Sequence, residues 1–395
     1  NNVVISNSGG SLFTATAGTS NFRAGVNAGN SIASGGIRNT VIGDEAGTAL
    51  TTGDANTAVG YLALAAEDAH GQNTAIGCRA LAVQDAGASA FNTAVGADAG
   101  LVISTGTHNT LIGGVAGDAL TVGVRNVAVG FASLSSDDVG SRSTAIGYQA
   151  LNAQNYAGST AVNSNNTAVG YEAGLAVSTG TGNTYIGTGA GDGSDDGANN
   201  VALGFGALSG NQGNNNVAIG EGAAIAATGA TNTVVGSGAC GGSFSASGTV
   251  AVGRSAGNGI AGGNNNICIG NAADVAASGQ VNGIALGVSI TAAANDFSFG
   301  KASNVVTNDF DADAAFSRAS DQRLKTNITA ASLGLDFVND LRPVTYKWKA
   351  SGDLDANDSE LAHLRVADDD GNIINHMTTD ITMHGLIAQE VKSAL

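Results

Sequence analysis

Cysteine and histidine are the side chains in the first three hundred residues that could bind a transition metal or carry redox chemistry. There are three cysteines, Cys78, Cys240 and Cys268, and two histidines, His70 and His108. Zinc sites and redox dithiols use closely spaced cysteine pairs, and no such pair occurs here. The histidines stand in loop-like sequence without an evident ligand partner. We therefore expect no metal and no cofactor, with the cysteines as structural filler and the histidines solvated.

Acidic residues dominate the charge of the chain. The formal net charge is −17, and residues 1–300 hold 17 Asp or Glu against six Lys or Arg. This balance argues against binding nucleic acid through its phosphates. The pairs Asp137-Asp138 and Asp195-Asp196 lie in expected loops, but no copy has the Gly-Gly-x-Gly-x-Asp pattern of calcium-loading β-rolls. Acidity favours a solvated extended surface over specific cation binding, with calcium left open.

Three blocks near the C-terminal end carry the most specific pattern. They are Ser320–Ile328 (Ser-Asp-Gln-Arg-Leu-Lys-Thr-Asn-Ile), Leu341–Trp348 (Leu-Arg-Pro-Val-Thr-Tyr-Lys-Trp) and His384–Val391 (His-Gly-Leu-Ile-Ala-Gln-Glu-Val). In this order they resemble the endosialidase-type C-terminal intramolecular chaperone, a self-cleaving domain of phage tail spikes and fibres and of the myelin regulatory factor. The resemblance covers residues 320–395, under a fifth of the chain.

The resemblance implies a serine–lysine dyad, with Ser320 as nucleophile and Lys325 as general base. Cleavage would fall between Ser320 and Asp321, and trimerisation would assemble the site. The chemistry is coherent, because a serine hydroxyl needs a base and a lysine can serve when burial or a cation such as Arg323 lowers its pKa. The chain would then be an autoproteolytic serine endopeptidase without an external substrate. The alternative is that Ser320 caps a helix or turn and Lys325 is a surface charge.

The chaperone segment departs from its family in one respect. Family members continue past the Gln-Glu-Val block into elements that wrap the trimer, whereas this sequence stops at Leu395. We therefore expect residues 320–395 to form a small, incomplete α+β domain, and self-cleavage in this chain stays open. Residues 349–383 have the acidic, loop-like composition of an insertion. His384 could carry a second proton, but a structural role is favoured.

The rest of the chain is a repeat. The pentad Asn56-Thr57-Ala58-Val59-Gly60 returns about every 17 residues, and each of sixteen anchors is followed four residues later by Gly. The anchors are Asn21, Asn39, Asn56, Asn73, Asn92, Asn109, Asn126, Ser143, Asn166, Asn183, Asn200, Asn216, Asn232, Thr249, Asn266 and Gly283.

One copy predicts strand, corner, strand, loop. Thr57–Val59 alternates between faces, Gly60 permits a positive φ, and Tyr61–Leu64 supplies a second apolar run. A lone coil cannot bury its apolar face, but stacked coils can. Residues 1–300 should therefore form an all-β repeat, a β-solenoid or β-roll of about 16 coils, on the order of 75 Å long at one strand spacing per coil.

Composition agrees with a thin core. Gly is 60 of 395 residues, Pro is one and aromatic residues are 5%, while 43% hydrophobic residues is too many for simple disorder. The repeat fades at Asn295–Gly300, whose two Phe could cap the open end. Residues 301–319 then form an expected linker. The chain begins at Asn1 rather than Met, so we expect a fragment or a processed product.

The repeat carries a second resemblance. Its Asn-x-Ala-Val/Ile-Gly copies are similar to the head repeats of trimeric autotransporter adhesins, whose chains form parallel β-rolls packed as trimers. Such a thin roll does not easily align three chains unaided, and the chaperone segment would supply that alignment. Once removed, it would leave a kinetically locked homotrimer.

The combined interpretation is a homotrimeric phage tail fibre or spike in the virion. Its partners would be a host cell-surface receptor or glycan, contacted through the loops of variable length at Ala86–Phe91 and Asn152–Asn165. Neither nucleic-acid binding nor membrane insertion is expected, since no apolar run is long enough to span a bilayer. The alternatives are a bacterial trimeric adhesin head at the cell surface and a tail-spike glycan depolymerase. The depolymerase would need clustered carboxylates, whereas the acidic residues are scattered through the copies.

Overall fold

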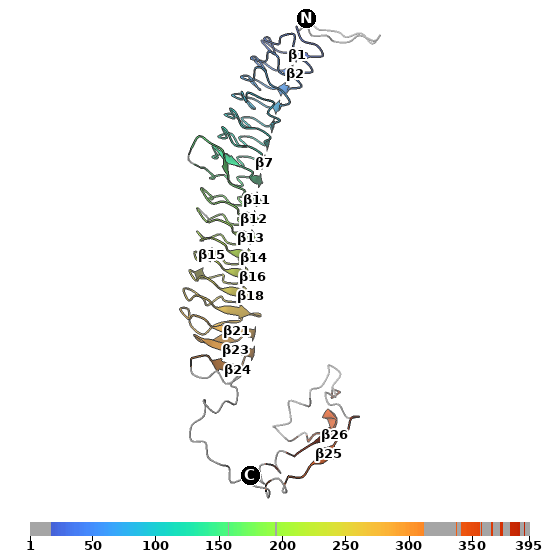
Figure 1. The fold of residues 1–395 in the computed structure, drawn as a ribbon, viewed down its shortest axis with the longest axis vertical. Helices are drawn as coiled ribbons and strands as arrows, with labels where there is room; N and C mark the ends of the chain where they lie inside the picture. The colour runs from blue at the N-terminus through green and yellow to red at the C-terminus, as the bar shows by residue number, and fades with distance from the viewer. Residues whose placement is uncertain are drawn as a thin grey trace. The chain divides into compact units, whose positions relative to one another are not determined.

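The computed structural model of the chain describes residues 17–156, 158–193, 196–311, 337, 341–355, 357, 365, 372–373, 380–387 and 391. The chain divides into two compact units, Asn1–Ser317 and Arg318–Leu395. Within the first unit, the predicted β-solenoid of about sixteen coils is confirmed: each repeat contributes one short strand to a single column (Figure 1).

The column is an 18-stranded sheet. Its strands in spatial order are β1 (Phe22–Ala24), β2 (Thr40–Ile42), β3 (Thr57–Val59), β4 (Thr74–Ile76), β5 (Thr93–Val95), β6 (Thr110–Ile112), β7 (Val127–Val129), β9 (Thr144–Ile146), β11 (Thr167–Val169), β12 (Thr184–Ile186), β13 (Val201–Leu203), β14 (Val217–Ile219), β16 (Thr233–Val235), β18 (Val250–Val252), β19 (Ile267–Ile269), β21 (Ile284–Val288), β23 (Asp296–Lys301) and β24 (Asn304–Asp309). From β1 to β23, successive strands pair in parallel with the same repeat position opposite itself, as Thr57 pairs with Thr74 and Ala58 with Ala75.

The core runs as a thin line of small side chains through the coils. In one repeat, Ala58, Ala63 and Leu64 are fully buried, and the equivalent Ala and Leu residues are buried in the neighbouring coils. Because only the middle residue of each three-residue strand points inward, alanine at that position sets how closely the opposite wall approaches.

The corner glycine is required by the stacking. Gly60 has φ +135°, and a Cβ there would come 2.4 Å from the carbonyl oxygen of Gly77 in the next coil. Any side chain would therefore force the two coils apart, which explains why Gly occupies this position in all sixteen repeats.

The expected second strand is wrong. Tyr61–Leu64 forms a tight turn in which Leu62 and Leu64 have φ near +50°. The Leu62 N–H donates back to Asp44 O and the Leu64 N–H donates forward to Ala80 O, so alternate amides serve opposite neighbouring coils. A flat strand cannot direct its amides in this way, whereas left-handed residues can.

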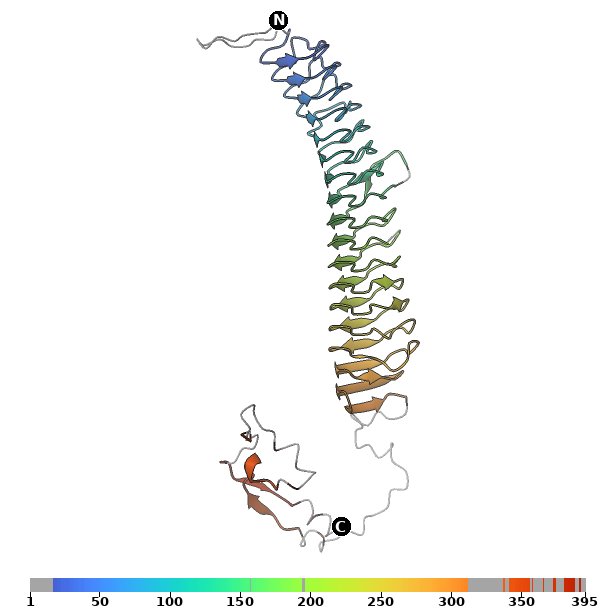
Figure 2. The ribbon, with the colours of Figure 1, turned by 180° about the vertical axis from the view of Figure 1, so that it is seen from behind.

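Short second ladders occur in three places only within the described part of the solenoid. These are the parallel pairs of β8 (Gly140–Ser141) with β10 (Val162–Asn163), β15 (Ala226–Ala227) with β17 (Ser243–Phe244), and β20 (Asp274–Val275) with β22 (Thr291–Ala292). The loop that carries β10 projects from the stack (Figure 2).

The end of the column is closed by a hairpin. β23, which contains Phe297 and Phe299, pairs in parallel with β21, and β24 then returns antiparallel to β23. Residues 304–309 are therefore strand, although this stretch was expected to belong to a linker. The β-branched residues Val305, Val306 and Thr307 suit the strand, and the turn at residues 302–303 allows it to fold back.

The second unit contains two described strands and one short helix. β25 (Val344–Tyr346) pairs antiparallel with β26 (Met383–Gly385), and the 3₁₀ helix η3 spans Ser351–Asp353. None of the described helices is long and apolar enough to cross a membrane.

Candidate functional site

A hydrogen-bonded ladder of asparagine side chains runs through the interior of the solenoid. Asn109 is typical: its Oδ1 accepts the backbone N–H of Asn126 at 2.9 Å, and its Nδ2 donates to Gly123 O at 2.9 Å. Both ends of the amide are used, so the anchor side chain holds its own coil closed and fastens the next one. This double role explains the asparagine at most anchor positions.

Two polar networks interrupt the apolar core beside this ladder. The core position eleven residues after the anchor is apolar in most coils, as with Leu50, Ile103 and Leu120. In two places, consecutive coils instead place an acid and then a glutamine there. We refer to each set of acid, glutamine and following asparagine as a relay.

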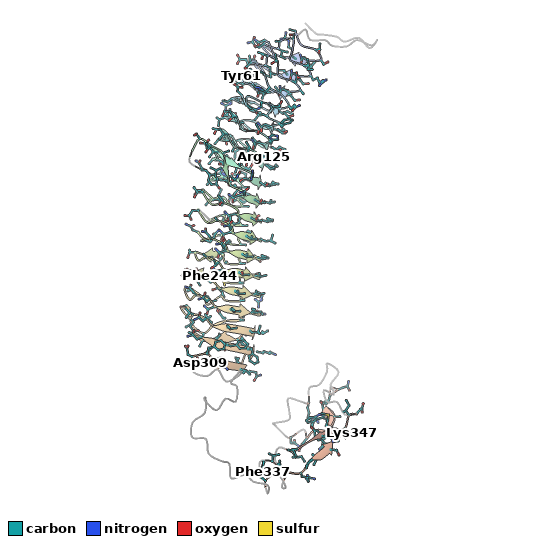
Figure 3. All side chains as sticks on the ribbon, viewed as in Figure 1. Tyr61, Arg125, Phe244, Asp309, Phe337 and Lys347 are labelled. Carbon is teal, nitrogen blue, oxygen red and sulfur yellow. The ribbon has the colours of Figure 1, made fainter. Side chains whose placement is uncertain are left out.

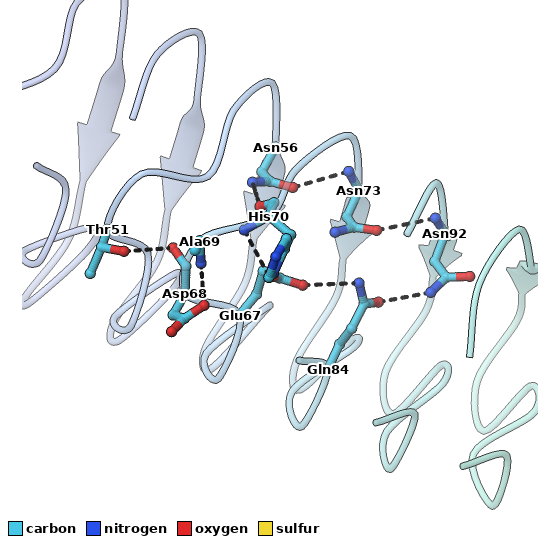
Figure 4. A network of polar contacts seen from close by, with 9 residues as sticks. All are labelled: Thr51, Asn56, Glu67, Asp68, Ala69, His70, Asn73, Gln84 and Asn92. Carbon is cyan, nitrogen blue, oxygen red and sulfur yellow. Dashed lines mark hydrogen bonds and ion pairs between the residues drawn. The ribbon is translucent and has the colours of Figure 1, made fainter. Parts of the chain in front are cut away.

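The first relay consists of Glu67, Gln84 and Asn92 (Figure 4). Gln84 Nε2 donates to Glu67 Oε2 at 3.2 Å, and Gln84 Oε1 accepts from Asn92 Nδ2 at 2.9 Å. The other carboxylate oxygen of Glu67 accepts the His70 backbone N–H at 3.1 Å. Burial raises the pKa of Glu67, and the hydrogen bond from Gln84 opposes that rise.

The second relay consists of Asp137, Gln154 and Asn166. Gln154 Nε2 donates to Asp137 Oδ2 at 2.5 Å, Gln154 Oε1 accepts from Asn166 Nδ2 at 2.8 Å, and Asp137 Oδ1 accepts the Gly140 N–H at 2.9 Å. Burial raises the pKa of Asp137 to about 6 despite these donors. The two relays thus share one hydrogen-bond plan in different coils.

The sequence-based placement of His70 is wrong. His70 Nδ1 lies 3.4 Å from Glu67 Oε1, and the ligand atoms of Glu67, Asp68, His70 and Asp85 all lie within 4.8 Å of one another. The acidic residues therefore converge here instead of staying scattered. The signal that could have found this site is an acidic residue followed by a glutamine in a repeat column that is apolar in most coils.

Two of the three cysteines are buried and one is exposed. Cys240 and Cys268 are buried, as expected of filler, and burial raises the pKa of the Cys268 thiol to about 12. Cys78 is exposed, so its expected role as buried filler is wrong. Its column follows the corner glycine and points outward, where other coils carry Tyr61 or Tyr148.

The predicted dyad, Ser320 and Lys325, and the cleavage position before Asp321 lie outside the described residues. Parts of the other two blocks are described, and they lie side by side. In the β25–β26 pair, Thr345 is opposite His384 and Val344 is opposite Gly385. His384 is exposed, which does not match the satisfied structural role favoured for it.

Residues 320–395 match the family model described as chaperone of endosialidase. The C-terminal segment is therefore of the endosialidase-chaperone type. This match confirms the resemblance drawn from the three blocks. No curated protein and no solved structure matches the chain.

The chaperone-type segment leaves apolar side chains in solvent. The rings of Trp348 and Tyr346 pack edge to face, with their centroids 5.4 Å apart. Trp348 and Leu386 are nevertheless each 46% exposed. A small unit with exposed large apolar residues has surface available for a partner.

The solenoid also presents an apolar stripe on the outer face of its strand column. The first and third residues of each strand point away from the core, and side chains project along this column in Figure 3. The third position is an exposed aliphatic residue in many coils. The members of this outer stripe are Ile76, Ile112, Ile146, Ile186, Leu203, Ile219, Ile269 and Leu286.

Proposed function

We propose that this chain forms a homotrimeric tail fibre or spike of a phage virion, which reaches a host surface receptor or glycan. The observation that carries the proposal is the pairing of a β-solenoid with an endosialidase-chaperone segment directly after it. Proteins of this chaperone type assist trimers of elongated chains, and a thin solenoid is a chain that needs such help.

The outer stripe supports association of three copies. A row of exposed Ile and Leu side chains along the whole strand column is costly in water, and burial returns about 25 cal/mol for each Å² of apolar surface. A row with an aliphatic residue at the same repeat position in successive coils is matched best by an identical row on a sister chain. Three copies would bury the stripes against one another.

The proposed domain arrangement has three parts. The solenoid shaft extends to residue 309, residues 310–319 connect it to the chaperone segment, and residues 320–395 promote trimerisation and then separate by cleavage. Ser320 Oγ, whose proton Lys325 takes, would attack the carbonyl carbon of the peptide bond to Asp321. The C–N bond then breaks, Lys325 returns the proton to the Asp321 nitrogen, and a cyclic ester of Ser320 remains. Water would then hydrolyse the ester and leave a new N-terminus at Asp321.

A depolymerase is the less favoured function at the converged carboxylates. Glu67 is fully buried and both of its oxygens accept hydrogen bonds, so a glycan cannot reach it. An adhesin head would share the repeat but would leave the chaperone segment without a role.

The test combines intact mass with the molar mass in solution. The protein, expressed from its complete reading frame, should give a product that ends at Ser320, and Ser320→Ala should abolish cleavage while light scattering still gives a trimer. Lys325→Ala should behave in the same way. Cleavage that persists in the Ser320→Ala variant would reject the dyad, and a monomeric cleaved product would reject the trimeric fibre.

A further inference from the structure

The two relays make an internal comparison, because they share the hydrogen bonds but not all the side chains. Each relay uses a buried acid, a glutamine and an asparagine, and each acid accepts the backbone N–H three residues later. That backbone position is Gly140 in the second relay and His70 in the first. The relay itself therefore needs no imidazole.

His70 is also an exception within its own repeat column. The carbonyl oxygen of the residue fourteen positions after the anchor accepts a hydrogen bond from the anchor amide, and this residue is glycine in most of these contacts. His70 provides the same carbonyl to Asn56 at 3.0 Å, so its side chain is an addition to the common function. The two relays also differ at the residue after the glutamine. It is Asp85, which carries a carboxylate, in the first relay and Asn155, which carries a neutral amide, in the second.

The added imidazole is not satisfied by hydrogen bonds. His70 Nδ1 is a buried atom with no hydrogen-bond partner, although Glu67 Oε1 lies 3.4 Å away. His70 Nδ1 and Glu67 Oε1 face each other at this distance. Ligand atoms around one tetrahedral Zn²⁺ are separated by about 3.3 Å, as follows from bonds of about 2.0–2.1 Å.

We propose that Glu67, Asp68, His70 and Asp85 bind a divalent transition-metal cation, with Zn²⁺ as the best match. One imidazole nitrogen with carboxylate oxygens is a ligand set that Zn²⁺ accepts. The Glu67 carboxylate is already oriented by Gln84, as metal-binding carboxylates usually are by an outer hydrogen bond. Among the described residues, none of these carboxylates pairs with Lys or Arg.

The proposed ion would join two coils. Glu67, Asp68 and His70 belong to one coil, whereas Asp85 belongs to the next and directly precedes the lengthened loop at Ala86–Phe91. Asp68 and Asp85 are exposed, so the ion has a route from solvent. Binding would fix Asp85, the residue directly before that loop, against the preceding coil.

The test is titration of the metal-free full-length protein with Co²⁺, followed by visible absorption, and with Zn²⁺ by calorimetry. The variant His70→Gly places at residue 70 the glycine that the second relay has at the equivalent position, Gly140. The variant Asp85→Asn places at residue 85 the asparagine that the second relay has at Asn155. His108→Gly is the matched control, because His108 lies in another loop and its φ of +59° suits glycine.

The wild-type protein should bind one equivalent of metal that His70→Gly loses, with affinity lower by on the order of 100-fold, and Asp85→Asn should weaken it by on the order of 10-fold. His108→Gly should titrate as wild type. Unchanged melting of His70→Gly in chelator verifies its fold. Equal binding by wild type and His70→Gly, or no binding at millimolar Zn²⁺, would overturn the site and leave a simple His70–Glu67 ion pair.

Discussion

Regular coils and relay coils fill the same interior position with different kinds of side chain, apolar in the regular coils and polar in the relay coils. In a regular coil the position eleven residues after the anchor is filled by a side chain such as Leu120, whereas the relay coils fill it with Glu67 and Gln84 or with Asp137 and Gln154. The strands keep the same register in both. The polar side chains occur in coils in which the loop after the glutamine is longer than usual. The anchors Asn73 and Asn92 are 19 residues apart, and Ser143 and Asn166 are 23 residues apart.

The difference shows what a longer loop requires. Lengthening removes the carbonyl that normally accepts the anchor amide, so the interior loses a fixed hydrogen-bond partner. A glutamine carries both a donor and an acceptor, and it can connect the acid of the previous coil to the asparagine of the next. The relay therefore adds side-chain hydrogen bonds to the backbone hydrogen bonds that hold the base of each lengthened loop, such as Asp85 N–H to Ser104 O and Asn155 N–H to Ser178 O.

The largest effect should come from breaking the second relay at its centre. Gln154→Leu removes the donor to Asp137 and leaves a buried carboxylate without its side-chain partner. We expect a loss of about 3–5 kcal/mol at pH 8, with β9 and β11 losing amide hydrogen-exchange protection before distant coils. The loss should shrink below pH 5, where the carboxyl is protonated.

The paired control converts the relay coils into regular ones. Asp137→Leu combined with Gln154→Leu supplies the apolar side chains that other coils carry at this position, and no buried charge remains. Stability should return to within about 1.5 kcal/mol of wild type. A double variant as unstable as the single one would mean that the long loop, and not the buried charge, sets the cost.

Removing only the charge should stabilise the solenoid. Burial raises the pKa of Asp137 from 3.8 to about 6, so the folded protein holds its proton to higher pH than the unfolded chain. This group thus favours folding fully below about pH 4, and its contribution is lost as the pH rises through 6. Asp137→Asn should be more stable than wild type by up to about 3 kcal/mol at pH 8 and equal to it at pH 4. Thermal unfolding at several pH values measures this, and a gap that does not change with pH would contradict it.

Much of the coil's structure can be predicted from the sequence, but the relays cannot. The period, the corner at Gly60 and the alanine core are visible because every copy repeats them. Glu67 and Gln84 are 17 residues apart, and each resembles a surface residue until the repeat columns are aligned. The turn at Tyr61–Leu64 was mistaken for a strand because apolar content does not reveal that alternate amides serve opposite neighbours. His70 was missed because its partners include Asp85 from another coil.

The smallest effect distinguishes the two lengthened coils from each other. Asn73 Nδ2 is buried without a partner, because the lengthened loop has removed its usual carbonyl. The corresponding anchor in the other lengthened coil is Ser143, whose shorter hydroxyl bonds Ser164 Oγ at 2.7 Å and leaves no such amide. Asn73→Ser should therefore cost about 1 kcal/mol less than Asn109→Ser, which removes an amide satisfied at both ends. Chemical denaturation of the two variants measures the difference, and equal losses would show that Asn73 Nδ2 is satisfied by a buried water.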